Sequence, residues 1–143
     1  MTSERTGIAM RPASGTTQPV PEPGLSSAEQ VEVWVRREAA AGQIVVVMQW
    51  QRKVREFFLD EIANLNFHKR RLTLTRYGRF DLEGRSMDVP RNALMLCVPT
   101  ADVLDAAATG RTWLDGRFMY RRELSPQERR LAGLIVGATS VQR

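Results

Sequence analysis

Few residues in this chain have the chemistry that catalysis or metal binding requires. The 143 residues include one histidine, His68, and one cysteine, Cys97. A Cys/His metal site or a nucleophile–histidine triad needs more partners than these two residues supply. His68 also precedes three basic residues at positions 69–71, in a segment predicted to be the turn of a hairpin. The sequence therefore favours a surface position for His68 over a role as a catalytic base.

Carboxylates offer one further candidate. Asp81 and Glu83 fall on the same face of a predicted strand, because side chains alternate along a strand, and a metal or acid–base site could be built on such a pair. Cys97 lies in an apolar run, which favours a small buried hydrophobic residue over a nucleophile. The sequence contains no glycine-rich phosphate loop and no dinucleotide fingerprint. We predict a non-enzymatic protein with no metal and no cofactor.

Basic residues form a more promising set. The net charge is +5, and positions 68–91 hold seven basic and three acidic residues. Leu72 and Leu74 alternate with polar residues, so the strand that contains them has one apolar and one polar face. Basic groups beside a ring that can stack suit a phosphate backbone with exposed bases. The predicted nucleic-acid site is His68, Lys69, Arg70, Arg71, Arg76, Tyr77, Arg79 and Arg85.

This polar face has a second interpretation, because one side of an antiparallel sheet is often simply solvated. The predicted function is a small regulatory protein that binds DNA or RNA through a basic β-sheet surface. The alternative is a protein–protein interaction module, an adaptor or a subunit of a larger assembly. It would use an open sheet edge or a hairpin at residues 113–120, with another protein or a second copy as its partner.

The sheet that would carry these surfaces is predicted over residues 43–99. Residues 43–51 and 54–59 are rich in β-branched and aromatic residues and predict two strands. Residues 60–63 predict a bend before a further hairpin. In that hairpin Leu65, Phe67, Leu72 and Leu74 face the core, and Lys69-Arg70 forms the turn. Residues 93–98 fit either a strand or a helix.

Helices are predicted on both sides of this sheet. Ser26 and Glu29 have the spacing of a capping box and begin a helix with Val31, Trp34 and Val35 on its apolar stripe. Residues 101–108 predict a short second helix. A second capping box begins the third helix, which has an apolar stripe of its own. The residues of this box and stripe are Ser125, Glu128, Leu131, Leu134, Ile135 and Ala138.

Asp115-Gly116 between apolar flanks is a strong hairpin signal, and it predicts the hairpin at residues 113–120. The predicted fold class is α+β: a curled antiparallel sheet of about five or six strands, packed by an N-terminal and a C-terminal helix. A small, partly open barrel of the SH3-like or PH-like kind is the alternative for residues 43–99.

The first 25 residues contain four of the seven prolines and few large apolar groups. Such a segment cannot bury enough surface to offset its conformational entropy. We therefore predict a disordered arm at residues 1–25 and a single domain at residues 26–143. The chain begins without an apolar signal segment, holds a single cysteine and has no apolar run long enough to cross a bilayer. These features predict a cytoplasmic protein without membrane contact.

Overall fold

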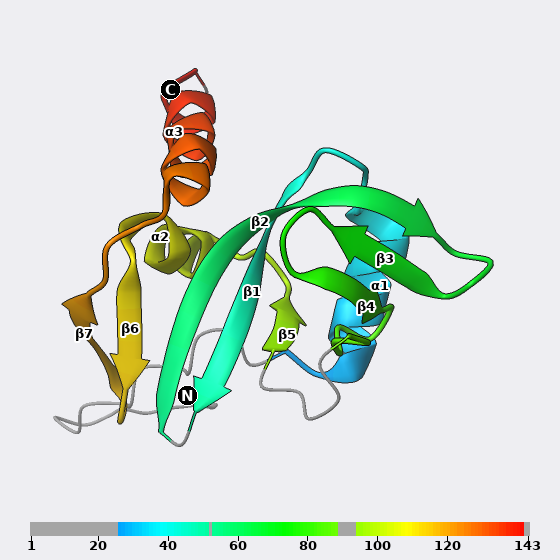
Figure 1. Cartoon of the computed structure of the whole chain (residues 1–143), viewed down its shortest axis with the longest axis horizontal. Helices are drawn as coiled ribbons and strands as arrows, with labels where there is room; N and C mark the ends of the chain where they lie inside the picture. The colour runs from blue at the N-terminus through cyan, green and yellow to red at the C-terminus, as the bar shows by residue number, and fades with distance from the viewer. Residues whose placement is uncertain (1–25, 52, 89–93, 142–143) are drawn as a thin grey trace, which may run out of the picture.

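The computed structural model describes residues 26–51, 53–88 and 94–141, and the predicted arm at residues 1–25 lies outside them. This part of the chain forms three helices and seven strands (Figure 1). In chain order they are α1 (Ala28–Glu38), β1 (Ile44–Gln51), β2 (Val54–Asn66), β3 (Arg71–Leu74), β4 (Gly78–Asp81), β5 (Leu94–Cys97), α2 (Ala101–Thr109), β6 (Arg111–Leu114), β7 (Arg117–Arg121) and α3 (Pro126–Val141).

The strands form one curled antiparallel sheet. Its order is β4-β3-β2-β1-β5, with β6 beside β2 and β7 beside β6. The chain between β4 and β5 draws the two ends of this order together. The amide of Leu96 donates to the carbonyl of Gly84 at 2.8 Å, and Arg85 forms a β-bridge with Met95. The α+β class and a partly open barrel are thus confirmed, whereas a likeness to SH3 or PH barrels stays a prediction.

Strand β2 differs from its prediction. A bend at residues 60–63 was expected to separate two strands, but β2 runs unbroken from Val54 to Asn66. Its register against β3 shifts between Ile62 and Asn64, which marks a bulge at Ala63. A bulge bends a strand without ending it. The first part of β2 therefore pairs with β1 and β6, and its last part pairs with β3.

Two apolar cores lie on opposite faces of the central strands. Val45 and Val47 of β1 pack with α1, β3 and β4 in one core, whereas Val46 and Met48 pack with α2, α3 and β6 in the other. Because alternate side chains of a strand point to opposite faces, a run of β-branched residues serves both cores. In Figure 1, α1 lies behind β3 and β4, and α2 lies on the other side of β1 and β2.

The helix starts agree only partly with the predicted capping boxes. Helix α1 is capped one residue later than expected: Ser27 Oγ accepts from the Gln30 amide at 3.1 Å, and Gln30 Oε1 accepts from the Ser27 amide at 2.8 Å. A glutamine completes a capping box as well as a glutamate does. The box of α3 is confirmed, because Ser125 and Glu128 exchange the same two bonds at 3.2 and 3.1 Å.

The remaining elements settle two expectations. The segment that fitted either a strand or a helix is strand β5, which pairs with β1. The Asp-Gly hairpin is confirmed: Asp115 and Gly116 have φ values of 49° and 94° between β6 and β7. Two consecutive positive φ values are typical of the type I′ turn that matches the twist of paired strands. Among the described residues, no helix is long and apolar enough to cross a membrane.

Candidate nucleic-acid interface

The loop between β2 and β3, residues 67–70, carries the most exposed part of the predicted basic surface. We call this loop the hairpin tip. The amide of Arg70 donates to the Phe67 carbonyl at 3.1 Å, and the amide of Lys69 donates to Asn66 Oδ1 at 3.0 Å. Arg70 adopts a left-handed conformation with a φ of 55°. These bonds fix a four-residue turn that projects beyond the strands.

The hairpin tip overturns one prediction. Phe67 was expected in the core beside Leu65, but its side chain is 43% exposed. The reason is the length of the turn. Strand β2 ends at Asn66, so Phe67 is the first residue of the loop and no longer follows the strand alternation. The tip therefore holds an exposed aromatic ring next to His68 and Lys69, which are also exposed.

The positive charge at the hairpin tip is only partly compensated. Arg70 Nη2 lies 3.7 Å from Glu32 Oε2 on α1, and the same carboxylate oxygen lies 2.8 Å from Arg36 Nε. One carboxylate thus faces two arginines, while Lys69 adds a further cation. Exposed ion pairs of this kind contribute little to stability and leave the arginines accessible. The tip is therefore a positively charged surface with a ring in it.

The other predicted arginines on β4 and beyond it are paired with carboxylates. Arg79 Nη2 lies 2.7 Å from Asp88 Oδ1. The hydrogen bond from Arg79 holds the pKa of the Asp88 carboxyl below its ordinary value. Arg85 contacts both Asp81 and Glu83. The pair that offered a metal or acid–base site by strand parity thus forms ion pairs with an arginine instead.

Arg71 stands on the same outward face. It lies opposite Asn66 on β2 and opposite Asp81 on β4. Its charge also contributes to the lowered pKa of Asp88. Positive and negative groups alternate over this part of the sheet, which weakens its attraction for a polyanion. The eight predicted residues therefore do not form one continuous basic face.

Tyr77 and Arg76 lie at the other end of β3, away from the hairpin tip. The Tyr77 ring is half-buried and packs on Phe58 with 5.7 Å between ring centroids. Burial raises the pKa of the Tyr77 hydroxyl. Asp60, fully buried, accepts the backbone amides of Arg76 and Tyr77, the latter at 2.9 Å. These contacts hold the turn between β3 and β4 against β2 and leave Tyr77 poorly placed for stacking on a base.

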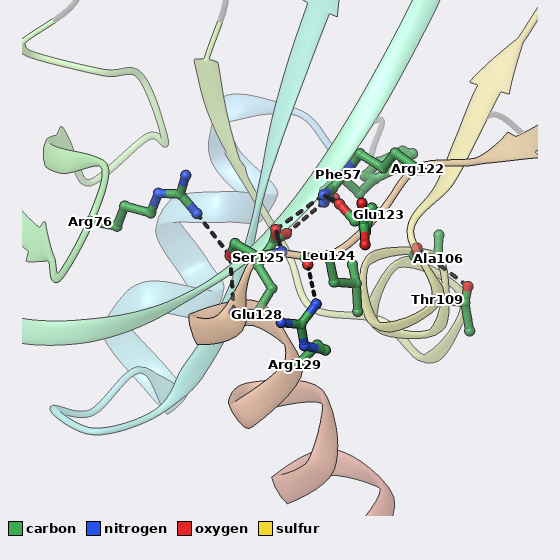
Figure 2. A network of polar contacts seen from close by, with 10 residues as sticks. All are labelled: Phe57, Arg76, Ala106, Thr109, Arg122, Glu123, Leu124, Ser125, Glu128 and Arg129. Atoms are coloured by element: carbon green, nitrogen blue, oxygen red, sulfur yellow. Dashed lines mark hydrogen bonds and ion pairs between the residues drawn. The ribbon is translucent and has the colours of Figure 1, made fainter.

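Arg76 joins a polar network at the start of α3, which Figure 2 shows. Arg76 Nη1 donates to Ser125 Oγ at 3.2 Å. Arg122 Nη1 and Nη2 lie 3.0 and 2.5 Å from the two carboxylate oxygens of Glu128, and Nη2 also donates to the Phe57 carbonyl at 2.7 Å. Both charged side chains are largely buried. The network anchors the first turn of α3 to the edge of β2, which is a structural task.

The described residues contain no group of three His, Cys, Asp or Glu side chains that could hold a metal ion. Cys97 is fully buried, and burial raises the pKa of its thiol to about 12. Cys97 is therefore a small buried residue of the core, as the sequence predicts. An open pocket of about 620 Å³ lies along α1, lined in part by Val33, Trp34 and Val98, and none of the eight predicted residues lines it.

The prediction from sequence missed Phe67 as a surface residue. The predicted turn had two residues, Lys69 and Arg70, and therefore placed Phe67 on a strand. Hairpin loops of four residues are also common. A four-residue loop before Arg71 would have placed the ring in the turn. The chain matches no known family model, no curated protein and no solved structure.

Proposed function

We propose that this protein is a non-enzymatic regulatory protein that binds single-stranded DNA or RNA through the hairpin tip and Arg71. The observation that carries the proposal is the exposed ring of Phe67 beside the three basic residues at positions 69–71. Stacking on an aromatic ring requires a base that is free of its own stack, as in a single strand or a loop. Neighbouring lysine and arginine side chains then neutralise the phosphates on either side of that base.

The size of the tip limits the expected affinity. Stacking of one base contributes about 1–3 kcal/mol. Two or three phosphate contacts add a salt-dependent attraction typical of non-specific binding, with dissociation constants on the order of 10⁻⁴ to 10⁻⁶ M. We therefore expect weak binding with little sequence preference, and a preference for single strands over duplex.

The test is fluorescence anisotropy with a labelled oligothymidine strand and with a duplex of the same length. Phe67→Ala should weaken single-strand binding by at least about fivefold, because one stacked base is lost. Phe67→Tyr, which keeps a ring, should bind nearly as the natural chain does. Equal affinity for Phe67→Ala, or tighter binding of the duplex, would contradict the proposal.

A second candidate function is a protein–protein interaction module. The observation that favours it is strand β7, which among the described strands pairs with β6 alone, with Met119 49% exposed on it. Open edges can accept a strand from another chain. Co-purification from the native host, with and without nuclease, separates the two functions. A protein partner that survives nuclease and is lost in Met119→Lys favours this candidate, whereas loss with nuclease favours nucleic acid.

A further inference from the structure

The carboxylate of Glu32 lies between helix α1 and the hairpin tip. Its Oε2 atom accepts a hydrogen bond from Arg36 Nε at 2.8 Å, one helical turn further along α1. The same oxygen lies 3.7 Å from Arg70 Nη2, which makes an ion pair but is too long for a hydrogen bond. Only 26% of the Glu32 side chain is exposed, against 63% of the Arg70 side chain. One partly buried anion is therefore shared by two exposed cations from different elements.

The packing of α1 holds these two arginines near each other. Val31 and Val35 of α1 are buried in the core that also holds Leu72 of β3, and Leu65 of β2 packs against the same core. Arg36 directly follows Val35 in the chain. The helix that carries Arg36 and the two strands that carry the hairpin tip are thus parts of one close-packed unit. The two cations therefore stay close to each other whether or not a carboxylate lies between them.

Two guanidinium groups around one carboxylate oxygen can also bind a phosphate. An arginine directs its N–H groups at the oxygens of carboxylates and phosphates in the same way. A phosphate group of a nucleic acid therefore competes with Glu32 for Arg36 and Arg70. Because Arg70 lies 3.7 Å from Glu32, it can turn toward a phosphate without breaking a hydrogen bond to this carboxylate. The amide of Arg70 also donates to the Phe67 carbonyl, so Arg70 and the exposed ring belong to the same turn.

We propose that α1 forms the second half of the single-strand surface. Arg36 and Arg70 bind one phosphate beside the base that stacks on Phe67, and Glu32 is an internal anion that competes with this phosphate. The inference rests on the proposed function, and it adds Arg36, which lies outside the hairpin tip, to the binding residues. Glu32 limits the affinity of the natural chain, because the phosphate must first displace a carboxylate that is already in place.

The first test is a substitution that should increase affinity. Glu32→Gln nearly keeps the shape of the side chain and removes its charge. At low salt, labelled oligothymidine should bind this variant about threefold more tightly than the natural chain, the usual size of one exposed charge interaction. A gain of affinity is not the result expected from damage to the fold. Equal or weaker binding would overturn the proposal.

Glu38→Gln is the matched control. Glu38 is exposed on the same helix, and it lines the pocket beside Trp34 and Val98, which Glu32 does not line. The variant removes the same charge from α1, so it measures the effect of net charge alone. We expect it to bind oligothymidine nearly as the natural chain does. A gain as large as that of Glu32→Gln would show that net charge, rather than the position of Glu32, sets the affinity, and would overturn the proposal.

Arg36 provides a comparison that general electrostatics does not reproduce. Arg36→Ala should weaken oligothymidine binding. In a chain with both Arg36→Ala and Arg70→Ala, the gain from Glu32→Gln should vanish, because no phosphate site is left for the carboxylate to compete for. Circular dichroism checks that these variants are folded. A gain that persists without the two arginines would overturn the proposal.

Phe67→Ala separates a failure of this inference from a failure of the proposed function. If Phe67→Ala loses affinity while Glu32→Gln gains none, the strand binds at the hairpin tip and α1 takes no part, which overturns the inference alone. If both variants leave the affinity unchanged, the proposed function fails, and the inference fails with it.

Discussion

The buried carboxylate of Glu128 accepts three hydrogen bonds from two residues near the start of α3. It pairs with both terminal nitrogens of Arg122 and accepts the amide of Ser125. Only 2% of this side chain is exposed. If the charge were removed, Arg122 would be left as a largely buried cation without its counter-ion, which is more costly than loss of the pair itself. The attachment of α3 to the sheet therefore depends on this residue.

We expect Glu128→Gln to lower the free energy of unfolding by about 3 kcal/mol, because breaking one side of a buried ion pair leaves the other charge uncompensated. Urea denaturation followed by tryptophan fluorescence measures the change. Glu123→Gln is the control, since Glu123 is exposed and should change stability by less than about 0.5 kcal/mol. Equal stability of the two variants would show that the pair does not anchor α3.

The pKa of Glu128 predicts how this contribution depends on pH. Burial disfavours the charged carboxylate, but hydrogen bonds from Arg122 and Ser125 outweigh burial and hold the pKa below its ordinary value of 4.5. A carboxyl whose pKa is lowered in the folded state stabilises the fold above its ordinary pKa. That stabilisation is lost as the pH falls through the lowered value.

The stability difference between the natural chain and Glu128→Gln should therefore be full at about pH 7 and should shrink below pH 4.5. Denaturation curves at about pH 7, 5 and 3 for both chains follow this difference. A difference that is as large at the lowest pH as at neutral pH would mean that the ionised carboxylate is not what stabilises the junction.

At the scale of the elements, the start of α1 offers a sharp test because two serines are adjacent there. Ser27 caps the helix, whereas no helix-capping bond of the described structure involves Ser26. Ser27→Ala should lower the free energy of unfolding by about 1 kcal/mol, the usual cost of a lost cap. Ser26→Ala is the matched control and should be nearly neutral. Thermal denaturation of both variants measures the two losses of stability. A larger loss of stability for Ser26→Ala would show that Ser26, as predicted from sequence, caps the helix.

Periodicity in the sequence predicted most of the helices and strands. It gave the wrong burial for two residues whose surroundings depend on the tertiary structure. Val31, Trp34 and Val35 share an apolar stripe and are buried as expected. Phe67 continued the alternation of β2 but lies in the turn, because the exact end of a strand depends on its partner and its loop. Leu134 continued the stripe of α3 but is exposed, because a stripe does not tell how far the supporting body extends.

The candidate site was predictable only in part for a similar reason. The basic run at residues 69–71 was visible in the sequence and does lie on an exposed hairpin. The pairing of Arg79 with Asp88 joins residues that are close in sequence, yet it depends on how the chain folds back after β4. Sequence gives the number of charges, and only the fold shows which of them compensate each other.

Considered as a whole molecule, the protein has two cores that share the central strands and three projecting features. The hairpin tip extends β2 at one end, and the β6–β7 hairpin and α3 extend in other directions (Figure 1). The β6–β7 hairpin and α3 are anchored in the second core through Trp113 and Leu131, whereas residues of the hairpin tip are exposed. Exposed loops on a packed scaffold often carry binding residues, and the proposed function assigns that role to the hairpin tip.

The salt dependence of single-strand binding tests the central proposal most directly. Each phosphate contact contributes about 0.7 to the slope of log affinity against log salt for a single strand. Lys69→Ala with Arg70→Ala should therefore reduce the slope by about 1.4. The control, Lys53→Ala with Arg117→Ala, removes the same charge from exposed positions in the two hairpin regions far from the tip. Anisotropy titrations between about 50 and 200 mM salt give the slopes. A reduced slope in the first double variant and an unchanged one in the control support the account, and equal slopes in both contradict it.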